Sequence, residues 1–227
     1  MKLKFLSILA VLIIATFSLT ACNVVQSKEY QATGEEYFEF VEREDDGLYA
    51  ITVKEGVTLP EKIKLPVEHD GVEVVEILAR AFKNNAEIKQ VIVPVGYSII
   101  GAEAFAYCKN LSTVTVGQHG GGESRDLTVR ASAFQGCTAL SSLTLGATVK
   151  VIDAYAFYET AVSALNFAKV TAIGANAFGS CAHLKSFYVP ASLISIDDNA
   201  FKGSTVQFTV AESNPVYDSE NGNLIKK

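Results

Sequence analysis

The dipeptide Ala-Phe recurs six times along the chain, at nearly constant intervals. Successive phenylalanines are 23, 29, 23, 21 and 23 residues apart. A unit of this length is too small to bury its own apolar face, and it is stabilised by stacking on copies of itself. The sequence therefore predicts a solenoid with one phenylalanine at the same position of each coil. These residues are Phe82, Phe105, Phe134, Phe157, Phe178 and Phe201.

The same frame surrounds each phenylalanine. Five positions before it stands an aliphatic residue: Ile77, Ile100, Val129, Ile152, Ile173 or Ile196. After it comes an apolar pair with one residue between its members: Val91/Val93, Val114/Val116, Leu143/Leu145, Leu165/Phe167, Phe187/Val189 or Phe208/Val210. Alternation with a period of two predicts a short strand whose paired residues point inward.

The repeats carry a family resemblance. Residues 100–111 read Ile-Gly-Ala-Glu-Ala-Phe-Ala-Tyr-Cys-Lys-Asn-Leu, and residues 173–184 read Ile-Gly-Ala-Asn-Ala-Phe-Gly-Ser-Cys-Ala-His-Leu. They resemble the bacterial BspA-type leucine-rich repeat over about residues 60–227, and residues 214–224 resemble an Asn-Pro-x-Tyr segment common in that family. The resemblance implies an α/β leucine-rich repeat fold, a right-handed, β-rich solenoid with a parallel sheet on one face and short helical turns or loops opposite.

The N-terminus resembles a bacterial lipoprotein signal. Lys2 and Lys4 precede an apolar run from residue 5 to residue 17, which is followed by Leu19-Thr20-Ala21-Cys22. A membrane-spanning helix needs about 20 apolar residues, so this shorter run favours a cleaved signal peptide over residues 1–21. The resemblance implies lipidation of Cys22, and the alternative is an ordinary residue at a signal-peptidase boundary.

After the signal peptide, residues 22–36 are expected to form a lipidated tether. Residues 37–227 are expected to form the solenoid. Residues 37–41 and 48–53 read as two strands joined by an acidic turn, within an N-terminal cap over residues 37–58. Strands at residues 62–65 and 72–77 would complete the first coil, with a C-terminal cap at residues 211–227. Caps of this kind cover the open edges of a solenoid.

Charge is distributed unevenly along the chain, whose net charge is −6. Residues 28–76 contain 14 acidic and 5 basic residues, whereas the repeats that follow are nearly neutral. Nucleic-acid-binding proteins need a basic surface, so nucleic acid is excluded as a partner.

Three cysteines occupy equivalent positions, three residues after a repeat phenylalanine: Cys108, Cys137 and Cys181. The slot favours a small side chain that bonds to a turn, and a buried free thiol is the default expectation. A disulfide between Cys108 and Cys137, on adjacent coils, is geometrically conceivable. An odd number of cysteines argues against a disulfide framework, and the spacing does not suit zinc.

The sequence does not predict an enzyme. His69, His119 and His183 fall on separate coils. His119-Gly120-Gly121-Gly122 resembles an esterase oxyanion loop, but the chain lacks the Gly-x-Ser-x-Gly elbow that works with it. The carboxylate pairs Asp197/Asp198 and Glu123/Asp126 lack the spacing of a calcium loop. No catalytic residue, metal or cofactor is therefore expected.

Residues 117–125 account for the long interval of 29 residues between Phe105 and Phe134, and we interpret them as an inserted loop. Its glycines allow many backbone conformations. Insertions in solenoids collect at exposed edges, so this loop is either a binding element or a neutral insertion.

The strand residues between the apolar pairs predict a binding face about 30 Å long, at about 4.8 Å per strand. One row is Ile92, Thr115, Thr144, Asn166, Tyr188 and Thr209, and its neighbour is Gln90, Thr113, Ser142, Ala164, Ser186 and Gln207. Serine and threonine also suit an exposed sheet through β-propensity alone. Tyr188 and Ile92 are the candidate contact residues because exposed aromatic and aliphatic groups contribute most to interfaces.

Two functions fit these observations. The first is a monomeric, exported, lipid-anchored module at the cell surface that binds an extracellular or envelope protein or glycan, an adhesin-like role implied by the family. The second is a structural or assembly protein of the periplasm or cell wall that has no host ligand. The fold does not identify the partner.

Overall fold

The computed structural model describes residues 32–227, except residues 118–123, 147, 166 and 168. The predicted signal peptide, Cys22 and most of the tether lie outside the described residues. So do His119, Glu123 and the glycines of the inserted loop, as well as Asn166 of the predicted face.

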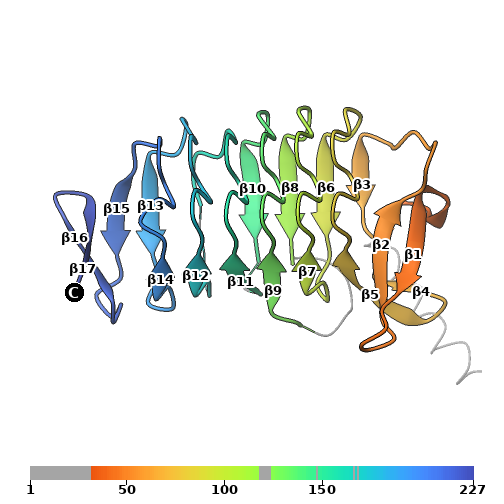
Figure 1. Ribbon diagram of the computed structural model, residues 1–227, viewed down its shortest axis with the longest axis horizontal. Coiled ribbons are helices and arrows are strands. Elements are labelled where there is room, and N and C mark those ends of the chain that lie inside the picture. Colours follow the sequence, from red (N-terminus) through yellow and green to blue (C-terminus); the bar gives the residue numbers. More distant parts are fainter. Residues whose placement is uncertain (1–31, 118–123, 147, 166, 168) are drawn as a thin grey trace, which may run out of the picture. The chain divides into compact units, whose positions relative to one another are not determined.

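Strands that precede the repeat phenylalanines form the first ladder, the lower row of arrows in Figure 1. Its spatial order is β1 (Phe38–Glu42), β2 (Tyr49–Val53), β5 (Val72–Ile77), β7 (Ile99–Ile100), β9 (Leu127–Val129), β11 (Val149–Ile152), β12 (Ala172–Ile173) and β14 (Ser195–Ile196). Pairing is antiparallel between β1 and β2 and parallel from β2 onward. A short strand β4 (Glu68–His69) pairs antiparallel with β5.

Strands that follow the phenylalanines form the second ladder, the upper row in Figure 1. It contains β3 (Lys62–Lys64), β6 (Gln90–Val93), β8 (Thr113–Val116) and β10 (Ser142–Leu145), all parallel. After a break in the hydrogen bonding, the second ladder continues with β13 (Ser186–Val189), which pairs parallel with β15 (Gln207–Val210). The coil between β10 and β13 was expected to contribute a strand at Leu165/Phe167, but neither residue is assigned to one, although both are buried.

The prediction of a β-rich solenoid of parallel strands is confirmed. The structure also shows the first ladder, a regular second row of strands beside the predicted one. Among the described residues the single helix is the 3₁₀ turn η1 (Glu35–Tyr37), so the segments after the phenylalanines are turns. The chain cannot form helices there because residues with positive φ recur every few positions.

The repeat phenylalanines stack into a column through the core. Adjacent ring centroids from Phe82 to Phe201 lie 4.7 to 5.5 Å apart. Five of the six rings are at most 2% exposed, whereas Phe201 in the last coil is half-buried. Burial of each ring contributes about 1.5–3 kcal/mol before chain entropy is subtracted.

Each phenylalanine lies in a turn whose backbone enters the left-handed region, on both sides of the ring in the first five turns and only after it at Phe201. Positive φ angles of 53° to 81° occur two residues before or after the ring, at Arg80, Asn84, Glu103, Tyr107, Ser132, Gly136, Tyr155, Glu159, Asn176, Ser180 and Gly203. This conformation costs a non-glycine residue about 1 kcal/mol or more. It is held by hydrogen bonds to the next coil, such as Phe105 N–H to the Ala133 carbonyl at 2.7 Å.

Hairpins close both ends of the repeats. At the N-terminal end β1 and β2 pair over their full length, and the edge of Phe38 packs on Phe82 with centroids 6.5 Å apart. At the C-terminal end β16 (Tyr217–Glu220) and β17 (Asn223–Lys226) pair antiparallel. Asn221 and Gly222 both have positive φ there, as a two-residue hairpin turn requires.

Candidate binding surfaces

The predicted binding face lies on the second ladder, and its exposure increases toward the C-terminal end. Gln90, Thr113, Thr115 and Thr144 are partly buried. The exposed members are Ser142, Ala164, Ser186, Tyr188, Gln207 and Thr209. The accessible part of the face is therefore the half around β13 and β15.

Ile92 does not belong to an exposed surface, and its prediction as a contact residue is wrong. Its side chain is only 7% exposed. It lies on the inner strand β6, where Lys64 and Thr115 are its register partners on the two sides. Side chains aligned in this way on adjacent strands pack against one another, and this removes the aliphatic group from solvent.

Tyr188 is the exposed aromatic residue of the face. Its side chain is 47% exposed and lies beside Thr209 in the β13–β15 register. Phe187 and Val189, its neighbours along the strand, point into the core and are at most 1% exposed. The ring is therefore presented to solvent by a strand that is anchored on both sides of it.

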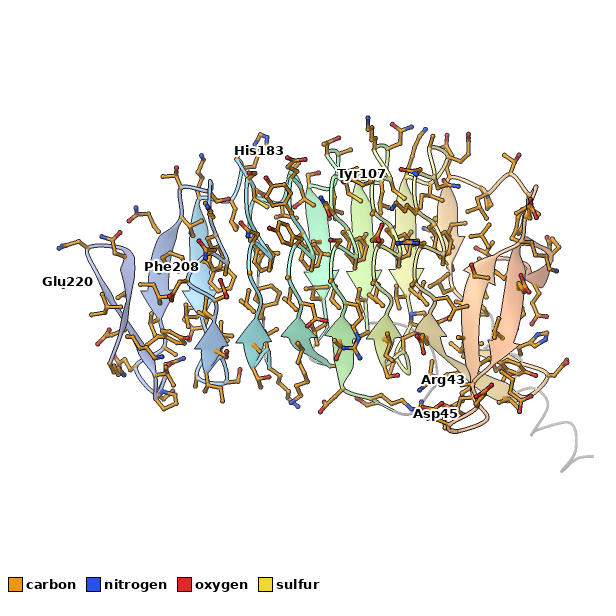
Figure 2. The ribbon with its side chains drawn as sticks, viewed as in Figure 1. Arg43, Asp45, Tyr107, His183, Phe208 and Glu220 are labelled. Carbon is orange, nitrogen blue, oxygen red and sulfur yellow. The ribbon has the colours of Figure 1, made fainter. Side chains whose placement is uncertain are left out.

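A second group of exposed tyrosines lies on the turns. Tyr107 and Tyr155 are 39% and 40% exposed, and Figure 2 shows Tyr107 on the same edge as His183. A Cβ atom added to Gly136 would lie 2.5 Å from the Tyr107 ring, so this ring rests on the backbone of the next coil. Contact of this kind gives Tyr107 a structural role.

The three repeat cysteines are buried free thiols, so the conceivable disulfide between Cys108 and Cys137 is absent. Each thiol donates to the carbonyl of the repeat phenylalanine in the preceding coil. Cys108 donates to Phe82 at 3.0 Å, Cys137 to Phe105 at 3.0 Å and Cys181 to Phe157 at 3.1 Å. The Ser204 hydroxyl makes the same bond to the Phe178 carbonyl at 2.8 Å. In these four coils the slot holds a small donor that ties one coil to the one before it, whereas Thr160 in the same slot donates to the Phe157 carbonyl of its own coil at 2.9 Å.

Several other titratable groups form structural pairs. Glu103 accepts hydrogen bonds from Lys83 and Arg80 of the preceding coil, and these bonds lower the pKa of its carboxyl group. Burial raises the pKa of Glu76, and Arg43, 3.6 Å away, opposes that effect. The Arg43 guanidinium also binds Asp45 at 2.9 Å. The Glu103 and Glu76 pairs connect neighbouring segments, whereas the Arg43–Asp45 pair lies within one turn.

His69 and His183, the histidines among the described residues, do not converge. His69 lies on β4, stacked on Phe40 of the N-terminal cap with centroids 3.8 Å apart, and the Glu35 carboxylate is 2.9 Å from its Nδ1 atom. His183 is exposed on a turn near the opposite end. In the part of the chain that the structure describes, no three His, Cys, Asp or Glu side chains are grouped to hold a metal ion.

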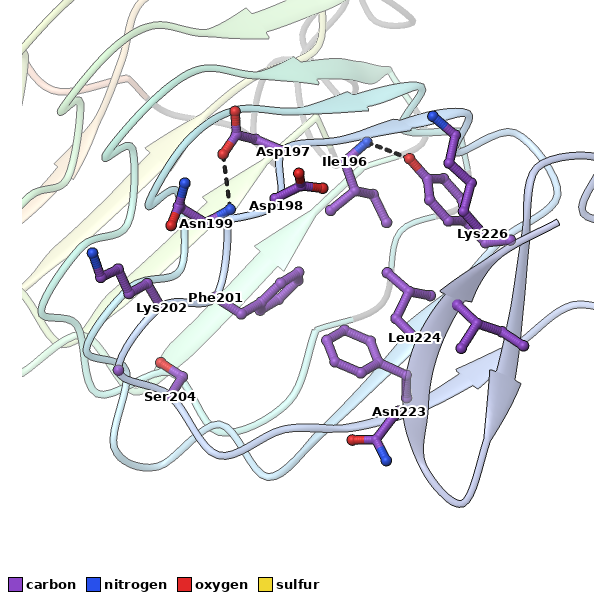
Figure 3. Close-up of a pocket in the computed structure, with 14 residues that line it drawn as sticks. Ile196, Asp197, Asp198, Asn199, Phe201, Lys202, Ser204, Asn223, Leu224 and Lys226 are labelled. Carbon is purple, nitrogen blue, oxygen red and sulfur yellow. Dashed lines mark hydrogen bonds between the residues drawn. The ribbon is translucent and has the colours of Figure 1, made fainter.

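A pocket at the C-terminal end was not predicted. Its volume is about 570 Å³, and it lies between the last repeat turn and the C-terminal hairpin (Figure 3). Its apolar lining includes Phe201, Phe208, Leu224, Ile196 and Ile225. Residues 214–224 could have indicated it, because they form the hairpin that bounds it, but their pattern does not show which side of the last coil stays open.

Comparison with models of known protein families shows which family the repeats match. The family described as BspA type leucine-rich repeat region matches residues 61–122 and 123–217 with six copies. The chain belongs to this family. BspA-type repeats thus cover more than half of the sequence, as the resemblance of its motifs implied.

Solved structures support the same fold. A leucine-rich cell surface protein from Faecalibacterium prausnitzii is 21% identical, with a TM-score of 0.62 over 87% of this chain and 59% of that one. For a leucine-rich repeat protein from Bacteroides ovatus the identity is 20% and the TM-score 0.58, over 83% of this chain and 55% of the other. The pneumococcal vaccine antigen PcpA is 16% identical, with a TM-score of 0.53 over 87% and 54%.

These three structures are longer, and the chain spans between 54% and 59% of each. No curated protein sequence matches it. Within the described residues, no helix is long and apolar enough to cross a membrane.

Proposed function

We propose that the chain is an exported, lipid-anchored binding module of the bacterial cell envelope that holds a protein or glycan on its second ladder. Residues 1–21 are its signal peptide, Cys22 carries the lipid, residues 22–36 are the tether, and residues 37–227 are the binding domain. The observation that carries the proposal is the family assignment together with the exposed strip around Tyr188 on rigid strands.

Lipid anchoring is tested by Cys22→Ser. Acylation with more than one chain makes membrane attachment stable, so the unaltered chain should partition into the membrane fraction. The variant should be recovered as unprocessed precursor and lack labelling by a radioactive fatty acid. An unaltered chain without fatty-acid label would refute the anchor and leave the binding face unaffected.

Binding is tested with an array of extracellular matrix proteins and glycans. For a ligand found there, Tyr188→Ala should weaken affinity about tenfold or more, as expected for an aromatic anchor. Tyr155→Ala is the matched control, since this tyrosine is similarly exposed but lies on a turn. Affinity lost in the control and kept in Tyr188→Ala would place the ligand elsewhere.

A further inference from the structure

In the repeat turns, the backbone hydrogen bonds between coils run in one direction. In each repeat turn, three backbone N–H groups donate to carbonyls of the following coil, from the phenylalanine and from the residues two before and two after it. In the fourth turn Tyr155, Phe157 and Glu159 donate to Ala175, Ala177 and Gly179 at 2.9, 2.8 and 3.0 Å. Every turn therefore presents a row of donors toward the C-terminal end.

Within the described residues, the last turn is followed by the C-terminal hairpin and not by another coil. Asn199 N–H donates to the Asp197 carboxylate at 2.9 Å, which satisfies the first of its three donors (Figure 3). For the N–H groups of Phe201 and Gly203, no acceptor is present among the described residues. Two donors that are paired in every earlier coil are therefore left open, two residues apart.

The C-terminal hairpin covers the last coil only along its strands. The Tyr217 hydroxyl accepts from Ile196 N–H at 2.8 Å, on the edge of the first ladder. The Gly222 carbonyl accepts from Phe208 N–H at 2.8 Å, on the edge of the second. The repeat turn itself remains uncovered, and the pocket of about 570 Å³ lies against it.

The pocket combines these donors with an apolar surface and both signs of charge. Phe201, Phe208 and Leu224 are half-buried and line it. Its charged residues are Asp197, Asp198, Lys202 and Lys226. Paired donors two residues apart match the carbonyls on one side of an extended peptide, whose main-chain bonds give affinity while a pocket holds a side chain.

We infer that this pocket binds a peptide segment of a partner protein. Two carbonyls of the segment, two residues apart, accept the N–H groups of Phe201 and Gly203. An apolar side chain of the segment packs between Phe201, Phe208 and Leu224. The segment thereby takes the place that a following coil occupies elsewhere in the solenoid.

The chain itself supplies a probe. A synthetic peptide copying residues 173–182, with serine at the Cys181 position, carries the carbonyls of Ala175, Ala177 and Gly179 that accept the donors of the preceding turn. It would be titrated into isotope-labelled full-length protein while the amide resonances are followed. We expect saturable shifts at Phe201 and Gly203, and none with a peptide of the same composition in scrambled order.

Two variants test whether the peptide binds in the pocket. Ile225→Glu places a charge at the pocket on a side chain that is 41% exposed, so folding is retained. It should weaken binding about tenfold. Ile194→Glu makes the same change at a position that is 53% exposed and outside the pocket, and binding should be unchanged.

Three results would overturn the inference. The first is the absence of saturable shifts at Phe201 and Gly203. The second is equal affinity for the peptide in the Ile225→Glu and unaltered proteins. The third is movement of the same resonances with protein concentration alone, which would make a second copy of the chain the occupant.

Discussion

At the scale of single residues, the phenylalanine column accounts for much of the stability. Phe134 is fully buried, with the rings of Phe105 and Phe157 at 5.1 and 5.2 Å on its two sides. We expect Phe134→Ala to lower the free energy of unfolding by about 3–5 kcal/mol. Phe201→Ala should cost less because its ring is half-buried. Urea denaturation measures both, and a smaller loss at Phe134 than at Phe201 would contradict this account.

The repeat thiols should be unreactive in the folded protein. The neighbouring Cys108 thiol and burial raise the pKa of Cys137, and burial raises the pKa of Cys181. Because the thiolate is the reactive form, alkylation at pH 8 should require denaturant. Site mapping by mass spectrometry measures this. Rapid modification of either residue in the native protein, or a recovered Cys108–Cys137 disulfide, would oppose the prediction.

At the scale of elements, the C-terminal hairpin depends on one buried amide. Asn214 is 1% exposed. Its Nδ2 donates to the Pro190 and Leu193 carbonyls at 2.7 and 3.0 Å, and its Oδ1 accepts from Val216 and Tyr217 N–H at 2.9 and 2.8 Å. The side chain thus connects the hairpin to the coil before it.

Asn214→Ala would leave these buried groups unpaired, at a cost of about 2 kcal/mol or more. Hydrogen exchange should accelerate at the amides of Val216 and Tyr217. Asn223→Ala is the control, since that residue is exposed on the same hairpin. Unchanged protection in Asn214→Ala would show that the hairpin is held by other contacts.

Contacts between adjacent turns include a pH-dependent pair. Bonds from Lys83 and Arg80 lower the pKa of Glu103 below its usual value of 4.5. A carboxyl group with a lowered folded pKa adds stability above its unfolded pKa, and that stability is lost as the pH falls through the folded pKa. Glu103→Gln should therefore reduce stability at pH 7 by less than about 1 kcal/mol and flatten its acid dependence. Parallel acid-unfolding curves for the two proteins would exclude this contribution.

At the scale of the whole molecule, the repeat frame was readable from the sequence because each coil must present the same apolar positions. Phe105 and Val114 follow that frame and are buried as it predicts. Exposure along the binding face could not be predicted from strand period alone, because it depends on what lies on adjacent strands. Ile92 shares its outward position with Tyr188, yet the first is buried and the second exposed.

The pocket could not be predicted from the sequence, for a related reason. Its open donors belong to the backbone of Phe201 and Gly203, and a backbone N–H group is identical in every coil. Only the arrangement of the hairpin against the last turn distinguishes them. Repetition therefore defines the solenoid, whereas the candidate binding sites arise where repetition ends or varies.

The most direct test of the central claim is antibody labelling of the mature domain on intact cells of the source bacterium, compared with cells whose envelope has been opened. The account predicts labelling of intact cells, with the Cys22→Ser strain as the control that should lose it. Labelling only after the envelope is opened would contradict a surface binding role, and would favour a structural or assembly protein inside the envelope.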